Sequence, residues 1–479
     1  MRCRRRVTIG DVTKLSTSRG RRAAQTIPAQ RDLALDAARV ACLIAVVVLH
    51  ILLVTLTTDP STGALRSVMA PTEASWYAPV SWLVQVMPLF FVVGGCASAI
   101  SWSRQSAEGV RGPAWVRARL LRLVVPASAV WVALALAGAL ATLVGMPADW
   151  ASMALQGLGM HLWFVGAYTA CLVGVPLLHG LHDRRPALTL AALVGLSAAI
   201  EVLRIAAERP WWGLLGFAPV WLAIHQIGFF RHDGSFARAS AGRLLGITAL
   251  SVLVMLCLTS LPWWGADGLS ALNPPTLCMI ALGAAQACVL QLCSPALERL
   301  MRWRPAQAVA WVVGSRATTL YLWHLPVIVA VMAVWWLLGG PDPVPGSAQW
   351  WLWRLPIGLL CWAMVLLVVR PLGVLEAVAG RIVAREPEPE GPAAGGSPSG
   401  ERPSTAPRAD GSAPLRASSP DRSSSPDGRA WVRILAAAVL VFSAAVLEVR
   451  FLLGIPLALG GAAAMVAAVL LLVPPARRS

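Results

Sequence analysis

The chain has 479 residues, of which 57% are hydrophobic and only 13% are charged, and its mean hydropathy is +0.66. Soluble domains carry about 25% charged residues, so this composition excludes an ordinary soluble protein and predicts an all-α polytopic membrane protein. The net charge of +17 comes from arginines that cluster at the ends of apolar runs. We interpret these arginines as topology signals and lipid-headgroup contacts, and we predict no nucleic-acid partner.

Ten apolar runs follow a polar start. Residues 1–31 are rich in arginine, serine and threonine and lack an apolar core, which predicts a disordered basic arm in the cytoplasm. Each later run is close to the ~20 residues that a spanning helix needs, so residues 32–384 are predicted to form a ten-helix bundle. The runs cover about 38–57, 80–101, 120–144, 161–180, 187–206, 213–230, 243–262, 274–293, 309–338 and 352–372. The ninth run is the longest, and we expect it to be bent or preceded by a surface turn.

Arginines alternate between the two sets of connecting loops. One set carries Arg104, Arg111, Arg117, Arg119, Arg122, Arg184, Arg185, Arg231, Arg238, Arg243, Arg299, Arg302 and Arg304. The other set holds only Arg66 and Arg209. Cytoplasmic loops carry the excess of arginine and lysine, so the first set and both chain termini are expected in the cytoplasm. We place the protein in the cytoplasmic membrane of a bacterium.

The composition changes after residue 384. Proline, serine, glycine and charged residues dominate 385–430, which predicts a disordered cytoplasmic linker. Two further apolar runs, about 431–448 and 451–473, predict a transmembrane hairpin within 431–479 and a total of twelve spans. We expect the hairpin to carry no buried ionisable residue and to have a structural or partner-docking role. A chain truncated near residue 384 is therefore expected to keep its activity.

The nine cysteines include no CxxC pair and no ligand cluster of the kind that holds a metal. Most of them lie inside apolar runs, where a free cysteine behaves as a small hydrophobic residue. We predict no metal site and no bound cofactor.

Ionisable residues stand inside the first apolar run. Arg39 and His50 are eleven residues apart, which places both on one face of a helix about 16 Å apart along its axis. A charge within a spanning helix costs at least ~2.5 kcal/mol near the centre, so such residues usually mark a function. Asp36 precedes Arg39 by three residues and is placed to pair with it. In the alternative interpretation, Arg39 reaches the lipid headgroups and His50 is a packing residue.

Five short motifs occur in order along the spans. They are Arg31 to His50 in the first run, Met87 to Gly95 (MPLFFVVGG), 117–126 (RARLLRLVVP), His161 to Tyr168 (HLWFVGAY) and Tyr321 to Pro326 (YLWHLP). In this combination, residues 31–372 resemble the bacterial integral-membrane acyltransferases of family three, the O-antigen acetylase type. The chain departs from that pattern at Gly94, where serine is usual, at Ala118, where arginine is usual, and at Ala317 and Thr318, where Ser-Tyr is common.

The resemblance implies an O-acyltransferase that moves an acyl group, acetyl among the candidates, from a cytoplasmic acyl-CoA to a hydroxyl of an envelope glycan or a lipophilic acceptor. An imidazole can take the hydroxyl proton at neutral pH, which makes His50 the candidate base. The guanidinium of Arg39 suits a phosphate or a developing oxyanion, and Asp36 would hold it. Whether His50 acts on the acceptor or first accepts the acyl group stays open.

Further candidates flank this pair. Arg119 and Arg122 suit the phosphates of coenzyme A, although a role as topology anchors is an equal alternative. Trp163, Tyr321 and His324 are candidates for contacting the acyl chain or the acceptor, with aromatic packing as the alternative. The role of His161 stays open.

A transporter or flippase that uses Arg39 and His50 along its pathway is the second hypothesis, and a scaffold is the third. The sequence contains no internal repeat that would pair two halves of a transporter. It identifies neither the acceptor nor the oligomeric state.

Overall fold

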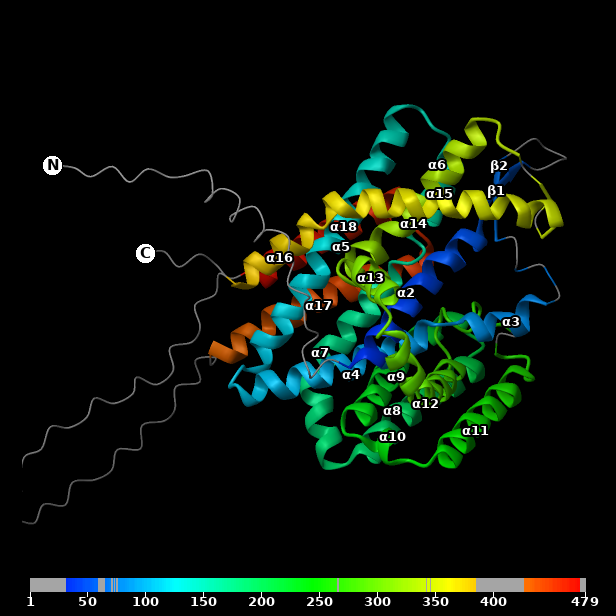
Figure 1. Ribbon diagram of the computed structural model, residues 1–479. Coiled ribbons are helices and arrows are strands. Elements are labelled where there is room, and N and C mark those ends of the chain that lie inside the picture. Colours follow the sequence, from blue (N-terminus) through cyan, green and yellow to red (C-terminus); the bar gives the residue numbers. More distant parts are fainter. Residues whose placement is uncertain are drawn as a thin grey trace, which may run out of the picture.

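The computed structural model describes residues 426–473 and residues 32–384, apart from 59–64, 70–71, 73, 75, 265–266, 342 and 345 (Figure 1). The predicted arm at 1–31 and most of the predicted linker lie outside the described residues. The described chain is almost entirely helical. The only strands within it are β1 (Val54–Thr58) and β2 (Leu65–Met69), which form one antiparallel hairpin with Val54 opposite Met69.

Most helices follow one another after short connections, with longer ones between α2 and α3, α11 and α12, and α16 and α17. In chain order they are α2 (Leu33–Leu53), α3 (Tyr77–Val84), α4 (Met87–Ala107), α5 (Gly112–Leu143), α6 (Ala148–Gly159), α7 (Trp163–Arg184), α8 (Pro186–Ala206), the 3₁₀ helix η2 (Pro210–Gly216), α9 (Phe217–His232), α10 (Ser235–Arg238), α11 (Ala241–Thr259), α12 (Leu277–Leu300), α13 (Arg304–Gly314), α14 (Ala317–Leu337), α15 (Ala348–Leu372), α16 (Val374–Ala384), α17 (Pro426–Phe451) and α18 (Ile455–Leu472).

Twelve helical stretches of the described chain are long and apolar enough to cross a membrane. This confirms the prediction of an all-α polytopic membrane protein with twelve spans. The long ninth run divides into α13 and α14 at Ser315 and Arg316, so the expected turn before this span is also confirmed.

Glycines allow the central helices α4 and α9 to touch through their backbones. A Cβ added at Gly228 of α9 would collide with the carbonyl oxygen of Val92 and lie 2.5 Å from the amide nitrogen of Cys96. A Cβ at Gly95 of α4 would likewise collide with the carbonyl oxygen of His225. Small residues at helix crossings are the usual way that membrane helices approach closely, because lipid offers no hydrophobic drive for their association. By contrast, only 17% of the apolar windows of α8 and α11 is buried. Helix α11 lies at the edge of the bundle (Figure 1).

The C-terminal hairpin packs into the bundle. Helix α17 lies along α7 and α18 lies along α5, where Gly461 leaves room for the indole of Trp131 (Figure 1). Helix α17 begins at Pro426 rather than at residue 431, and it continues to Phe451.

Because α17 extends to Phe451, Glu448 lies inside the helix and not in the turn, and its side chain is only 4% exposed. The expectation that the hairpin carries no buried ionisable residue is therefore wrong. Hydropathy alone placed the helix end at the first charged residue, whereas packing against α7 extends the helix past it.

Candidate active site

A network of polar side chains holds the start of α2. Asp32 caps the helix by accepting a hydrogen bond from the Leu35 amide at 2.9 Å, and its other carboxylate oxygen pairs with Arg231 at 3.0 Å. Arg231 also donates to Gln291 at 2.8 Å, so the network joins α2, α9 and α12. Neither Asp32 nor Arg231 was predicted as a site residue, since their partners lie far apart in the sequence.

A cavity of about 290 Å³ lies among α2, α4, α5, α7 and α14. Three guanidinium groups line it, those of Arg39, Arg119 and Arg122. The sequence named all three residues, and the structure brings them together at one cavity. Arg117 is not among the lining residues, which is consistent with a topology anchor at that position.

Arg119 is held in place before any ligand arrives. Its guanidinium donates to the hydroxyl of Ser101 and lies 5.4 Å from the ring centroid of Trp115. The Trp115 indole donates to the same hydroxyl at 3.2 Å. Arg122, one turn further along α5, is exposed. One of the two cations is therefore preorganised, and the other is exposed.

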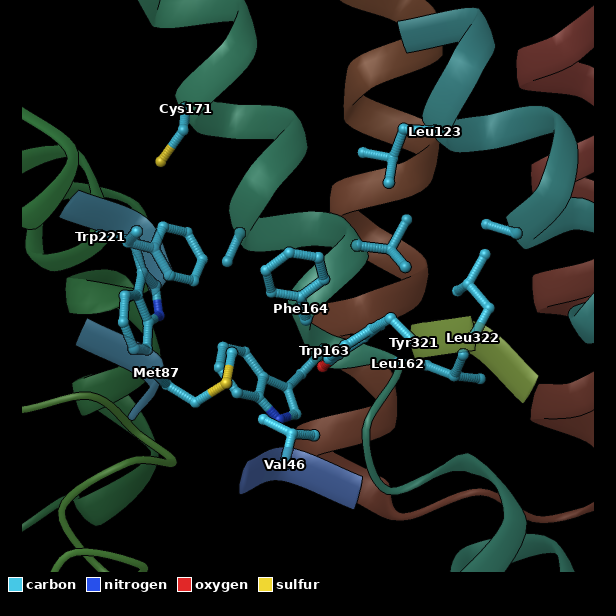
Figure 2. Close-up of a cluster of buried hydrophobic side chains, with 14 of the residues drawn as sticks. Val46, Met87, Leu123, Leu162, Trp163, Phe164, Cys171, Trp221, Tyr321 and Leu322 are labelled. Atoms are coloured by element: carbon cyan, nitrogen blue, oxygen red, sulfur yellow. The ribbon is translucent and has the colours of Figure 1, made fainter. Parts of the chain in front are cut away.

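Aromatic side chains form the other end of the cavity. Phe90, Phe164 and Tyr321 line it, with the rings of Phe164 and Tyr321 4.5 Å apart (Figure 2). Tyr168 also lines it, and a Cβ at Gly94 would lie 2.9 Å from the Tyr168 ring. This close approach gives a physical reason for glycine at position 94, where the resembled family usually has serine.

Trp163 lies outside the cavity lining. Its indole stacks on that of Trp221, with ring centroids 5.3 Å apart and planes at 24° (Figure 2). Trp163 is only 4% exposed. Its position is that of a core residue, and Phe164 beside it is the residue that faces the cavity.

A cluster of three histidines adjoins the aromatic end of the cavity. His324 of α14 lies beside His50 of α2, with Nε2 of His324 3.2 Å from Nδ1 of His50. The ring of His161 lies 5.2 Å from that of His324, and its Nε2 is 3.0 Å from the carbonyl oxygen of Leu322, a cavity residue. The hydroxyl of Tyr321 donates to the His161 carbonyl at 3.1 Å. The cavity and the histidine cluster therefore share a wall, built from Tyr321 and Leu322.

The hydrogen bonds assign the protons of the cluster. Nδ1 of His50 is 2.8 Å from the carbonyl oxygen of Val46, and Nδ1 of His324 is 2.5 Å from that of Tyr321. A carbonyl only accepts, so both Nδ1 atoms carry hydrogen. The single hydrogen on Nδ1 of His50 is then shared between the Val46 carbonyl oxygen and the lone pair on Nε2 of His324. In a neutral His50 this leaves Nε2 as the nitrogen that can take a proton.

The prediction that Arg39 and His50 share one helix face agrees with this geometry. Arg39 reaches a cavity that α14 lines with Ala317, Tyr321 and Leu322, while His50 meets His324 of the same helix. The expected pair between Asp36 and Arg39 stays a prediction. Asp36 lies in the first turn of α2.

Arg354 of α15 is a buried residue that sequence reasoning did not single out. Its guanidinium donates to the carbonyl oxygens of Ile51 at 3.3 Å and Val54 at 3.1 Å, and also to the hydroxyl of Thr55. These carbonyls belong to the C-terminal end of α2, where a cation also suits the helix dipole. Arg354 therefore fixes the end of α2 directly after His50. An arginine inside an otherwise apolar run was the available signal.

His161 was noted in the sequence, but its role was left open. It stands next to the LWF motif, but its partner at Leu322 is 161 positions away in the chain. Within the described residues, no three His, Cys, Asp or Glu side chains are grouped so as to hold a metal ion.

Comparison with known protein families gives one match. The family model of an acyltransferase domain, that of acyltransferase family 3, matches residues 32–370, which is more than half of the chain. The match covers α2 to α15, with the cavity and the histidine cluster, and ends before α17 and α18. No curated protein and no solved structure matches. The chain therefore belongs to acyltransferase family 3 and is a multi-pass membrane acyltransferase.

Proposed function

We propose that the protein transfers an acyl group, acetyl among the candidates, from cytoplasmic acyl-CoA to a hydroxyl of an envelope glycan or a lipophilic acceptor. The observation that carries this proposal is the shared wall: one cavity has three arginines and ends against Tyr321 and Leu322, which also contact the histidine cluster. Membership of an acyltransferase family does not favour the transporter alternative.

The arginines suit the polyphosphate end of the donor. Guanidinium groups bind phosphate oxygens in a planar, charge-assisted manner, and Arg39, Arg119 and Arg122 line the same space. Arg39 lies about 16 Å from His50 along α2, at 1.5 Å per residue, which is too far to reach an oxyanion beside His50. We therefore assign Arg39 to donor binding and not to oxyanion stabilisation. The acyl thioester would extend past Phe90 and Phe164 toward the cluster.

His50 would provide the base. Its Nε2 takes the proton of the acceptor hydroxyl while the hydroxyl oxygen attacks the thioester carbonyl. A carbon–oxygen bond forms, the carbon–sulfur bond breaks, and the departing thiolate of coenzyme A receives the proton from Nε2 of His50. His324 keeps the His50 ring in orientation through its Nε2, and Arg354 holds the helix end on which His50 lies.

The regular alternation of arginines in the loops supports an orientation in which both termini and the arginine end of the cavity lie in the cytoplasm. We propose the cytoplasmic membrane of a bacterium as the location. The donor would then enter from the cytoplasm, and the acceptor would reach His50 from the other side.

The test uses the purified full-length protein in lipid nanodiscs with acetyl-CoA, and it measures release of the free thiol of coenzyme A. We expect thiol release that depends on the protein and is inhibited by desulfo-coenzyme A, which keeps the phosphates but lacks the sulfur. Absence of thiol release with short- and long-chain acyl-CoA donors, in the presence of membrane lipids and glycan acceptors, would contradict the proposal.

A further inference from the structure

The C-terminal hairpin, which the acyltransferase family model does not include, packs against the start of α7, directly after His161. A Cβ at Gly166 of α7 would meet Ala445 of α17, whereas a Cβ at Gly159 would meet Leu453 just after α17. Gly159 ends α6 just before α7, and at the other end of α17 a Cβ at Gly112 would lie 3.3 Å from Trp431 and 3.7 Å from Pro176 of α7. Helices α17 and α7 therefore run in opposite directions, and the part of α17 after Ala445 lies next to residues 160–165. Glu448 lies in that part.

Glu448 is buried with an unsatisfied oxygen. The side chain is 4% exposed, and its Oε2 has no hydrogen-bond partner among the described residues. It lies near enough to Tyr321 to interact electrostatically with the phenol, whose hydroxyl binds the backbone of His161. A buried polar atom without a partner costs free energy, so such an atom in a packed core calls for an explanation.

A second unsatisfied atom lies in the segment that Glu448 faces. Nδ1 of His161 is buried and has no partner among the described residues. Nε2 of the same ring lies 3.0 Å from the Leu322 carbonyl, so Nε2 carries the hydrogen and Nδ1 presents a lone pair. A carboxyl group buried in apolar surroundings is most stable in its neutral form, which has an O–H to donate. The two atoms are therefore complementary.

We propose that Glu448 is a positioning residue for the histidine cluster, and that its carboxyl O–H is linked to Nδ1 of His161 through one bridging water molecule. This link keeps the His161 ring turned toward the Leu322 carbonyl and so holds the stretch of α14 that carries His324. His324 in turn orients His50. The inference rests on the proposed function, because it assigns a role within the same site.

The test compares Glu448→Gln, Glu448→Leu and wild type as full-length proteins in nanodiscs with acetyl-CoA. Glutamine keeps a donor at this position, so kcat should stay within about threefold of wild type. Leucine removes the donor, so kcat should fall by about tenfold, the effect of one lost hydrogen bond, with KM for acetyl-CoA unchanged. The matched control is Leu447→Ala, whose side chain is 42% exposed on the same helix and should leave kcat unchanged.

An infrared spectrum checks the bond without relying on turnover. The C=O stretch of a protonated carboxylic acid should be present in wild type, absent in Glu448→Gln and shifted in His161→Phe. Wild-type kcat in Glu448→Leu, or an unshifted band in His161→Phe, would overturn the inference while leaving the proposed function intact. Equal loss of kcat in the glutamine and leucine variants would overturn the role as a donor. Absence of acyl transfer by the wild-type protein would instead refute the proposed function.

Discussion

Removing single arginines from the cavity should weaken donor binding in a graded way. Arg119 and Arg122 both line the cavity, but only Arg119 is held by Ser101 and Trp115, whereas Arg122 is exposed. Arg117 is on the same helix and outside the cavity lining, which makes Arg117→Ala the matched control. We expect Arg119→Ala and Arg122→Ala to raise KM for acetyl-CoA, with the larger effect at Arg119.

The size of the effect follows from exposure. A hydrogen bond to a charged group contributes about 1.5–3 kcal/mol when it is well formed, and less where solvent screens it. For the exposed Arg122, we expect the alanine variant to lose about 1–2 kcal/mol of donor-binding free energy. This loss corresponds to a rise in KM of roughly 5- to 30-fold. The preorganised Arg119 loses less side-chain entropy on binding, so about 2–3 kcal/mol and a rise of roughly 30- to 150-fold are expected there.

Steady-state kinetics of thiol release in nanodiscs provide the measurement. Phosphate contacts are the same in the ground state and the transition state, so kcat should change little. The increase in KM should shrink at high salt, because exposed charges are screened. If Arg117→Ala raised KM as much as Arg122→Ala, or if the Arg119 and Arg122 variants lowered kcat at unchanged KM, the assignment of the cavity to donor phosphates would be refuted.

Three further results are expected. The sequence alone predicts that a chain truncated near residue 384 keeps its activity, but the packing of α17 on α7 and α18 on α5 reverses this expectation. Truncation should lower both thermal stability and activity, and an active, stable truncated protein would show that the hairpin is dispensable. Gly228→Ala should destabilise the protein by about 1–3 kcal/mol in thermal unfolding, because its Cβ would collide with the α4 backbone, whereas Gly246→Ala, with nothing within 4 Å, should not. Reporters active only outside the cell should give signal when fused near residues 65, 150 and 345 but not near 110, 235 or 400, and the reverse pattern would contradict the orientation.

Hydropathy and helical periodicity were enough to predict the architecture. The twelve spans follow from the length of apolar runs, and the spacing of Arg39 and His50 predicts that both lie on one face of their helix. The structure shows that this face meets α14. These patterns are local in the sequence. They suffice because each spanning segment in lipid must satisfy its own backbone hydrogen bonds by forming a helix.

Hydropathy and periodicity could not predict the contacts that complete the site. His161 and Arg354 act through backbone carbonyls more than 150 positions away, at Leu322 and at Ile51. Trp163 was a candidate for acyl or acceptor contact with aromatic packing as the alternative, and its indole stacks on Trp221. Such pairings depend on which helices become neighbours, and a single sequence does not contain that information. The predicted end of the first hairpin helix at Glu448 was wrong for the same reason. Helix α17 packs against α7 and continues past this charged residue.

The most direct test of the account is acyl transfer by His50→Ala. Labelled acetyl-CoA, the purified variant in nanodiscs and an acceptor that the wild-type protein uses would be combined, with circular dichroism to confirm a folded protein. His179→Ala is the control, since His179 lies outside the cavity lining and binds Ser103 and Asp183. We expect a loss of transfer by about 10²- to 10⁴-fold in His50→Ala and little change in the control. Wild-type kcat in a folded His50→Ala protein would contradict the role of His50 as the base.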